Sequence, residues 1–336
     1  MSLEEIVDTA EFRRSSILSR GINWILKHTI LPQFPKEHMD SYLRQWEPSS
    51  RNVEIALEGL LKLARRPRHC WAVLSTLKDW GDNYFPNADE RPRYLINTQH
   101  DEKIPFRGEA DIMYVYMIAQ IGYVANGLAE NTTIEEMRTV AQGFKEMNRT
   151  GGKAFSEHPS VMPRVTEHDR LSLRAAQKLD KPYNACPSLH IAYSIYMDNV
   201  AGRYLKDRDM LDSIRKSAKA MLNSVLYVKQ HSILDVAFGI MCARIVYEKT
   251  YGEGFNDFTE VFDELREEHP TIDYDEISSV YREIEEIREK MQDKTDLAGM
   301  MGTYLKRHGY KKIRPEEDVN NAYFDTERRE IIFKNK

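Results

Sequence analysis

Cysteine is scarce in this sequence, and its few copies stand far apart. The 336 residues include three cysteines, Cys70, Cys186 and Cys242. An odd number at wide spacing excludes a disulfide scaffold of the kind that stabilises small secreted domains. The spacing fits a protein that stays in a reducing compartment, so we expect a cytoplasmic location.

An excess of basic charge is also missing. Lysine and arginine together number 48 against 53 aspartate and glutamate residues, which gives a formal net charge of −5. The two signs are mixed along most segments and form no basic block. Nucleic-acid binding leaves an electrostatic footprint of clustered lysine and arginine. We therefore expect no nucleic-acid partner.

Long hydrophobic runs are rare. The first residues, Met1 to Glu5, carry acids where a secretory signal carries bases, and no apolar run follows within the first 20 residues, so we expect no export. One run of 18 uncharged residues, Ile112 to Ala129, contains Gln120 and Asn126. We interpret this run as a buried core helix rather than a membrane span. Contact with membranes, where it occurs, would be peripheral.

Strand patterns are scarce as well, and helical spacing of apolar residues dominates. The sequence therefore predicts an all-α fold. One exception is the tail, where Asn321 to Asp325 and Glu330 to Phe333 flank a polar turn and could pair as a hairpin. Helices are expected over Phe12 to Thr29, Arg51 to Leu63, Cys70 to Tyr84, Glu109 to Ala129, Ile134 to Arg149, His190 to Tyr204, Asp207 to Lys249 in pieces, and Phe255 to Glu268.

The chain is long enough for one large body or two ordinary domains, and its 41% hydrophobic content suffices for a core. We expect an N-terminal helical extension over residues 1–100, a catalytic helical bundle over 101–251 and a C-terminal helical extension over 252–336. The segment Glu276 to Gln292 is an amphipathic helix that could dock on the body or form a homodimer contact. The acidic run Asp263 to Glu268 is interpreted as a solvated helix face rather than a metal site.

Two short segments carry the chemistry. In the first, Pro187-Ser188-Leu189-His190, a proline and a small hydroxyl residue stand where a helical pattern begins. Pro187 can open that helix and Ser188 can cap it. Free backbone N–H groups at such an end attract an oxyanion, which makes this segment a candidate phosphate site.

The second segment is Lys229-Gln230-His231-Ser232-Ile233-Leu234-Asp235. His231 and Asp235 are four residues apart, which is one turn along one face of a helix. The carboxylate can hold the imidazole in one tautomer and stabilise its positive form. An oriented imidazole is what covalent phosphoryl transfer needs. Either segment alone is more often structural, and their joint occurrence points to a site.

Together the two segments resemble the second and third signature motifs of the type 2 phosphatidic acid phosphatase and vanadium haloperoxidase superfamily. The Pro-Ser-Leu-His form, with Asn184 before it and Val236 after the second segment, is similar to the inositol phosphorylceramide synthase-like branch. The resemblance covers roughly residues 101–247. It implies that His231 attacks phosphorus to form a phosphohistidine, that Asp235 orients it, that His190 protonates the leaving oxygen, and that Ser188 binds the phosphate.

The resemblance is incomplete in the cations that would hold the phosphate. The family's arginine six residues before the nucleophile is replaced by Val225. Its first motif is not intact either, and the best replacements lie in the polar segment 151–164, which we expect to be a loop. Arg164 is the first candidate, because arginine grips phosphate in a bidentate manner, and Lys153 is the second. Lys229 is a third candidate that would lie across the helix from His231.

The resemblance implies a phosphatase that needs no cofactor and no metal, acting on a phosphorylated small molecule or an amphiphile such as a prenyl diphosphate or a lipid phosphate. Three alternatives stay open. A phosphotransferase would use the same residues with an acceptor alcohol in place of water. A vanadate-dependent haloperoxidase would need a fuller set of cations. A non-catalytic helical binding protein would explain the missing arginine.

Overall fold

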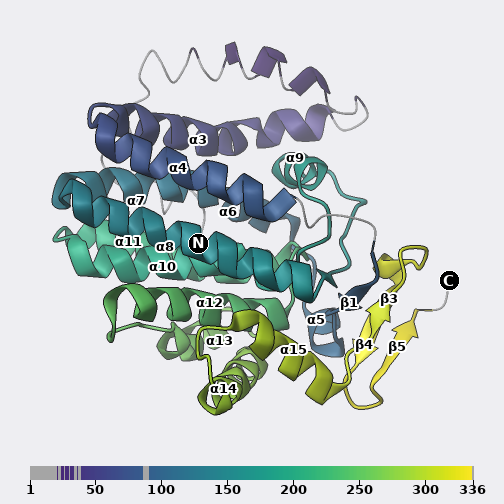
Figure 1. Cartoon of the computed structure of the whole chain (residues 1–336). Helices are drawn as coiled ribbons and strands as arrows, with labels where there is room; N and C mark the ends of the chain where they lie inside the picture. Colours follow the sequence, from purple (N-terminus) through teal and green to yellow (C-terminus); the bar gives the residue numbers. More distant parts are fainter. Residues whose placement is uncertain are drawn as a thin grey trace.

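The computed structural model of this chain describes residues 39–85 and 91–334, together with positions 21, 24, 25, 27–29, 31–33 and 36. The fold is all-α with a small β appendage (Figure 1). The expected helix Phe12 to Thr29 lies for the most part outside the described residues. A short 3-10 helix, η1, covers Leu31–Gln33.

The helices are stacked in layers. In the outermost layer, α3 packs on α7 and α4 packs on α8. Beneath them lie α10, α11 and α12, and α14 and α15 cover the other side of α12 (Figure 1). The bounds of the main helices are α3 Met39–Ala64, α4 Pro67–Tyr84, α7 Met117–Asn131, α8 Ile134–Glu157, α10 Leu189–Tyr204, α11 Arg208–Tyr227, α12 Ile233–Tyr251, α14 Tyr274–Lys290 and α15 Leu297–His308.

Short elements connect these layers at one end of the bundle. Two strands, β4 and β5, pair antiparallel with Ala322 opposite Phe333, so the expected C-terminal hairpin is confirmed. A three-stranded sheet in the order β2-β1-β3 is an addition that the sequence does not predict. The bounds are β1 Arg93–Leu95, α5 Gln99–Lys103, η4 Gly108–Ala110, α6 Asp111–Val115, β2 Ser160–Val161, α9 Leu171–Leu179, η5 Thr259–Val261, α13 Phe262–Glu268, β3 Lys312–Ile313, η6 Val319–Asn321, β4 Ala322–Asp325 and β5 Glu330–Phe333.

Most expected helices are confirmed, and the differences have local causes. The break predicted after Arg149 is wrong, because α8 continues through two buried glycines to Glu157. The glycine pair is tolerated there because its lack of side chains admits Leu189 and Asn83 against the helix. The expected helix Glu109 to Ala129 is divided at Tyr116 into α6 and α7. Helix α15 is a further element that the sequence does not predict.

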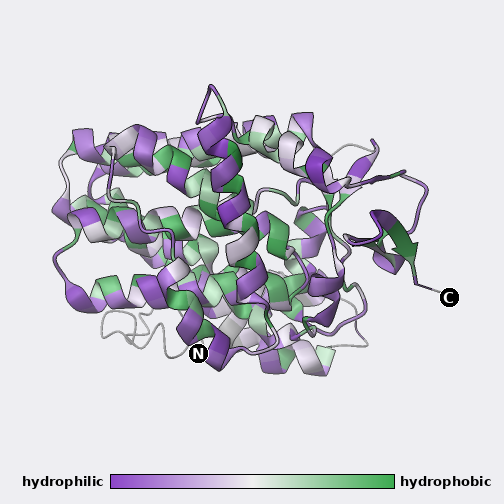
Figure 2. Ribbon diagram, turned by 90° about the horizontal axis from the view of Figure 1, so that it is seen from below, coloured by the Kyte–Doolittle hydropathy of each residue, from purple (hydrophilic) through white to green (hydrophobic). Residues whose placement is uncertain are grey.

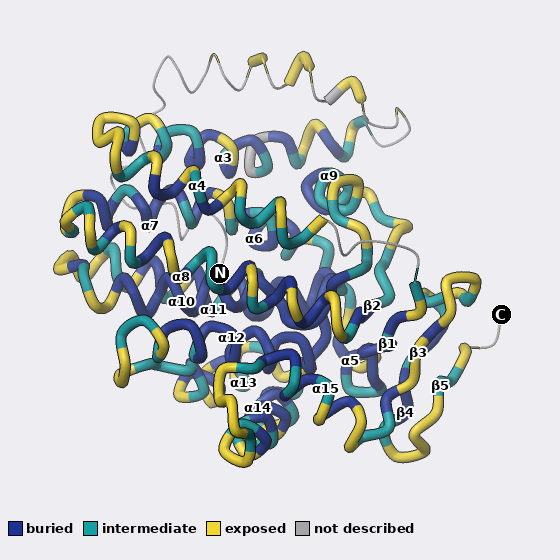
Figure 3. The backbone as a smooth tube through the Cα atoms, viewed as in Figure 1, coloured by how far each residue is buried: buried dark blue, intermediate teal, exposed yellow. Residues whose placement is uncertain are grey.

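One hydrophobic core runs through the described chain, from Ile55 in α3 to Phe324 in β4. Its centre is α10 and α12, which are buried along most of their length. Figure 3 shows the buried backbone in the middle layers and exposed turns at the periphery. Figure 2 shows hydrophobic and hydrophilic residues alternating along the outer helices, as in amphipathic helices. The division into three parts stays a prediction.

The amphipathic segment expected over Glu276 to Gln292 corresponds to α14. Its apolar residues Ile277 and Ile284 are fully buried, and the helix packs against α12. Helix α14 therefore packs on the body of the protein. The dimer contact stays a prediction.

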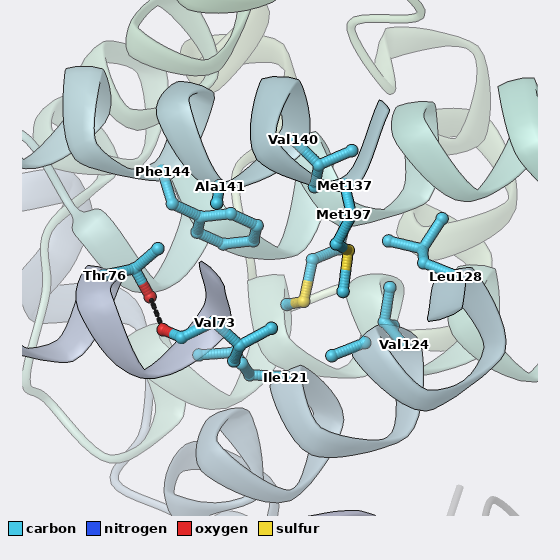
Figure 4. A pocket seen from close by; sticks show the side chains of 11 residues that line it. Val73, Thr76, Ile121, Val124, Leu128, Met137, Val140, Ala141, Phe144 and Met197 are labelled. Atoms are coloured by element: carbon cyan, nitrogen blue, oxygen red, sulfur yellow. Dashed lines mark hydrogen bonds between the residues drawn. The ribbon is translucent and has the colours of Figure 1, made fainter. Parts of the chain in front are cut away.

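The stretch Gly108–Asn131, which contains α7, is long and apolar enough by length and composition to cross a membrane. In the fold, 67% of its most apolar window is buried. It lies next to an apolar cavity of about 30 Å³ lined by residues of α4, α7, α8 and α10, including Val73, Val124 and Met197 (Figure 4). That volume holds one water molecule at most.

Candidate active site

The two sequence motifs meet where α10 and α12 begin. Ser188 is the N-cap of α10, and its hydroxyl accepts a hydrogen bond from the backbone N–H of Ile191, so the expected cap is confirmed. Pro187 precedes this cap, so the expectation that it opens the helix is wrong. The backbone N–H of Ser188 donates to the carbonyl of Asp235 at 2.9 Å, which ties the first motif to the second.

His231 lies in the turn between α11 and α12, one residue before the N-cap Ser232. The expectation that His231 and Asp235 share a helical face is therefore wrong, because the helix starts between them. The turn is held by the carbonyl of Val225, which accepts from the N–H groups of Gln230 and His231 at 3.1 and 3.2 Å. Val225 thus anchors the backbone of His231.

The tautomer of His231 follows from its neighbours. Its Nδ1 lies 2.8 Å from Asp235 Oδ2 and 3.2 Å from the carbonyl oxygen of Ala185. Both oxygens accept hydrogen bonds, so Nδ1 carries the proton and Nε2 carries the lone pair in the neutral ring. His231 is 8% exposed, which leaves little room for water to compete. Its Nε2 therefore presents an oriented, largely desolvated lone pair, which is what a nucleophilic imidazole needs.

Asp235 is completely buried, and it is the third residue of α12. Its Oδ1 accepts from the hydroxyl of Ser232 at 2.6 Å and from the backbone N–H of the same residue, which forms a capping box. Burial raises the pKa of Asp235, and the hydrogen bonds and charge of His231 oppose that rise. Hydrogen bonds from His231 and Ser232 stabilise the charged carboxylate of Asp235. The same carboxylate therefore caps the start of α12 and orients His231.

His190 faces His231 from the first turn of α10. Its Nδ1 lies 3.4 Å from Nε2 of His231, and its ring stacks on Tyr114 with the ring centroids 4.4 Å apart. The side chain is half-buried. Burial, His231 and the charge of Arg164 together lower the pKa of His190 well below its usual value. At neutral pH this ring is therefore mostly neutral, and its protonated form becomes more abundant as the pH falls.

Arg164 is the predicted cation that lies within electrostatic range of His190. Its charge acts on His190 and Tyr114, and its side chain is almost fully buried. The guanidinium donates from Nη2 to the Asp180 carboxylate at 2.8 Å and from Nη1 to the carbonyl of the same residue. Tyr84 donates to the other carboxylate oxygen of Asp180. The Nε of Arg164 is a buried donor with no hydrogen-bond partner.

The two lysines lie elsewhere. Lys153 is on the outer side of α8, where it pairs with Asp296 at 2.9 Å and is 53% exposed. Lys229 has a positive φ of 55°, and its Nζ donates to the backbone carbonyl of Asp101. Neither ammonium contacts the histidines. Ser188 is fully buried, and the contacts of its N–H and hydroxyl are internal to the α10–α12 junction.

Sequence reasoning missed the residues that support this site. Tyr114 stacks on His190, and Asp180 with Tyr84 holds Arg164. Asp101 accepts from the backbone N–H of Ile233 at 2.8 Å and so fixes the start of α12. The capping pattern Thr98-x-x-Asp101 carries a readable signal, whereas tyrosines without a periodic context carry none.

Metal coordination has no visible basis in the described part of the chain. No group of three or more histidine, cysteine, aspartate or glutamate side chains lies together as a metal would require. The acidic run Asp263 to Glu268 is engaged in ion pairs, among them Asp263 with Arg266 and Glu264 with Lys219. This is the arrangement of a solvated helix face.

Comparison of the chain with known protein families, with curated proteins and with solved structures gives no match.

Proposed function

We propose that this protein is a phosphatase that cleaves a phosphomonoester or diphosphate through a phosphohistidine and needs no metal. The observation that carries the proposal is the line of three side chains Asp235, His231 and His190, with contacts of 2.8 and 3.4 Å. One ring nitrogen of His231 faces the Asp235 acceptor, and the other faces the imidazole of His190. This arrangement is expected of a nucleophile, its orienting group and a proton donor. The resemblance of the two motifs supports the same interpretation.

The chemistry divides into two displacements. In the first, Nε2 of His231 attacks phosphorus, the bond from phosphorus to the leaving oxygen breaks, and His190 gives that oxygen a proton. In the second, water attacks the phosphohistidine, His190 takes a proton from the water, the P–N bond breaks and inorganic phosphate leaves. Asp235 stabilises the positive charge that His231 acquires.

Arg164 is the residue that would hold the phosphate, through its unpartnered buried Nε and through the nitrogens now on Asp180. A phosphate that enters beside His190 competes with the Asp180 carboxylate for the same guanidinium. Asp180 therefore sets the strength of phosphate binding, because it keeps the cation neutralised until a stronger anion arrives.

The defining experiment is phosphate release in the presence of a chelator, measured on an aryl phosphate, farnesyl and geranylgeranyl diphosphate and a lysophosphatidate. The wild type is compared with His231→Ala, His190→Ala and Asp235→Asn. We expect losses of at least ~10²-fold for each variant. His308→Ala is the matched control, because that histidine is partly exposed on α15 and pairs with Glu283. Rapid acid-free quenching of labelled substrate should trap a base-stable phosphohistidine that His231→Ala lacks.

Three outcomes separate the alternatives. Release that rises or changes product when an alcohol is added indicates a phosphotransferase with the same site. Tight phosphate binding without turnover indicates a binding protein, for which the engagement of Arg164 by Asp180 is the specific support. Oxidation of halide by peroxide after vanadate loading would indicate a haloperoxidase. Equal activity of wild type and His231→Ala would refute the proposal.

A further inference from the structure

An apolar stripe runs along the outside of α4, and four large side chains form it: Trp71, Leu74, Leu77 and Phe85. Their exposed fractions are 73%, 39%, 46% and 52%. The first three lie at helical spacings of three, and Phe85 follows at the end of the helix, so the four fall on one side. The stripe spans roughly 20 Å at 1.5 Å per residue. The exposed ion pair of Lys78 and Asp82 separates Leu77 from Phe85. Large apolar side chains exposed together on one side of a helix mark an interaction site.

Basic residues stand at the start of the stripe. The turn between α3 and α4 reads Arg65-Arg66-Pro67-Arg68, and all three arginines are exposed. No acid interrupts the sequence from this turn to Trp71. Farther along, Lys78 is exposed on the same side and pairs with Asp82. A tryptophan next to a cluster of arginines is suited to a surface that is apolar inside and negatively charged outside.

The other end of the stripe reaches the candidate active site. Tyr84, the last residue of α4, donates to Asp180, which holds Arg164. Phe85 follows Tyr84 in the chain, and Leu179 precedes Asp180. Both are large hydrophobic residues with exposed side chains, and Leu179 is 81% exposed. Helix α4 thus runs along the outer layer toward the end of the bundle that carries the small sheet (Figure 1). An apolar rim lies beside the group that would bind phosphate.

We propose that α4 docks this protein on an anionic lipid surface through the stripe and the arginine turn. The docking stands apart from the proposed phosphatase activity. Charge complementarity favours lipid over a second copy of the chain, because the arginine turn needs an anionic partner. A second copy seated on the stripe would also cover the rim beside the site.

The test is flotation of the full chain with vesicles of phosphatidylcholine alone or with added phosphatidylserine. We expect binding to the anionic vesicles only, and weaker binding as salt is raised. Trp71→Ala should lower the partition coefficient by roughly tenfold, a change of ~1.4 kcal/mol. Arg65→Gln with Arg68→Gln should lower it by about thirtyfold. Phe333→Ala, an exposed aromatic on β5, is the control and should bind as the wild type does.

The outcomes distinguish the two proposals. Loss of vesicle binding in Trp71→Ala with unchanged aryl phosphate release supports the docking surface. Binding of vesicles without any phosphate release keeps the docking surface and refutes the phosphatase. Equal binding by wild type and Trp71→Ala, or no binding at all, refutes docking. A dimer in sedimentation that Trp71→Ala dissociates would show that the stripe is an interface between copies, which also overturns the proposal.

Discussion

Gly239 of α12 packs against the N-cap of α10, and replacing it with alanine tests whether this contact sets the active-site geometry. A Cβ at this position would lie 2.7 Å from the carbonyl oxygen of Ser188 and 3.0 Å from Cβ of Ile191. An ordinary carbon to oxygen contact is about 3.3 Å, so the two helix starts must move apart by about 0.6 Å. The oxygen belongs to the backbone and accepts from Ala192 N–H, so it cannot turn aside.

The expected cost follows from this displacement. Overpacking in a core costs about 1–3 kcal/mol, while replacing a helical glycine with alanine returns up to ~1 kcal/mol, so we expect a net destabilisation of ~1–2 kcal/mol for Gly239→Ala. The two sides of the contact carry His190 and, through Asp235, His231. A misplacement of 1 Å costs about 10²-fold in rate, so about 0.6 Å should cost roughly tenfold in kcat/KM.

Gly202→Ala is the matched control, because Gly202 lies in α10 and a Cβ added there would meet no atom within 4 Å. It should be as stable as the wild type or more stable by up to ~1 kcal/mol, with unchanged activity. Urea denaturation of both variants measures the free energy of unfolding, and aryl phosphate hydrolysis measures kcat/KM. A Gly239→Ala protein as stable as Gly202→Ala would refute the packing argument, whatever the protein catalyses.

Three further predictions concern pH and packing. In the proposed mechanism His190 acts in its protonated form, and its pKa lies well below 6.5, so kcat/KM should fall with rising pH already below pH 6.5. The charge of Arg164 helps to lower this pKa, so Arg164→Gln should move the fall to higher pH in a pH–rate profile. Burial raises the pKa of Asp198 to about 6, so the folded protein keeps a proton that the unfolded chain has released. The free energy of unfolding should therefore decline by at most ~3 kcal/mol as the pH rises from about 4 to 6. Urea denaturation across this pH range should show a smaller decline for Asp198→Asn, and an equal decline in both proteins would contradict this. Val124→Ile should fill the apolar cavity of about 30 Å³ and raise the free energy of unfolding by up to ~0.8 kcal/mol. A free energy of unfolding below that of the wild type would mean that the cavity cannot admit a methylene group.

Local signals in the sequence are enough for most of the helices and for the two motifs. The cap at Ser188, the hairpin of β4 and β5 and the amphipathic α14 all follow from spacing that a single segment contains. The break predicted after Arg149 failed because a glycine pair is a helix breaker only on average, and here close packing of Leu189 and Asn83 stabilises it.

The supporting residues of the site could not be predicted, because they are brought together by tertiary packing. Tyr84, Tyr114 and Asp180 come from α4, α6 and the end of α9, three elements separated widely in the chain. Arg164 is a candidate from its chemistry alone. The segment of Lys153 is helical where the sequence predicts a loop, and on that helix the side chain of Lys153 pairs with Asp296.

In the proposed mechanism one histidine ring must move before phosphorus can reach Nε2 of His231, because the free protein keeps the two histidines in contact. The 3.4 Å between Nε2 of His231 and Nδ1 of His190 leaves no room for a phosphoryl group. His231 is fixed by two acceptors on Nδ1, and one of these, Asp235, is itself held by Ser232. The ring of His190 is held by a stack on Tyr114 and one long contact, so His190 is the ring that turns. Titration with inorganic phosphate should shift the imidazole NMR signals of His190 more than those of His231, and the reverse order would show that the nucleophile moves instead.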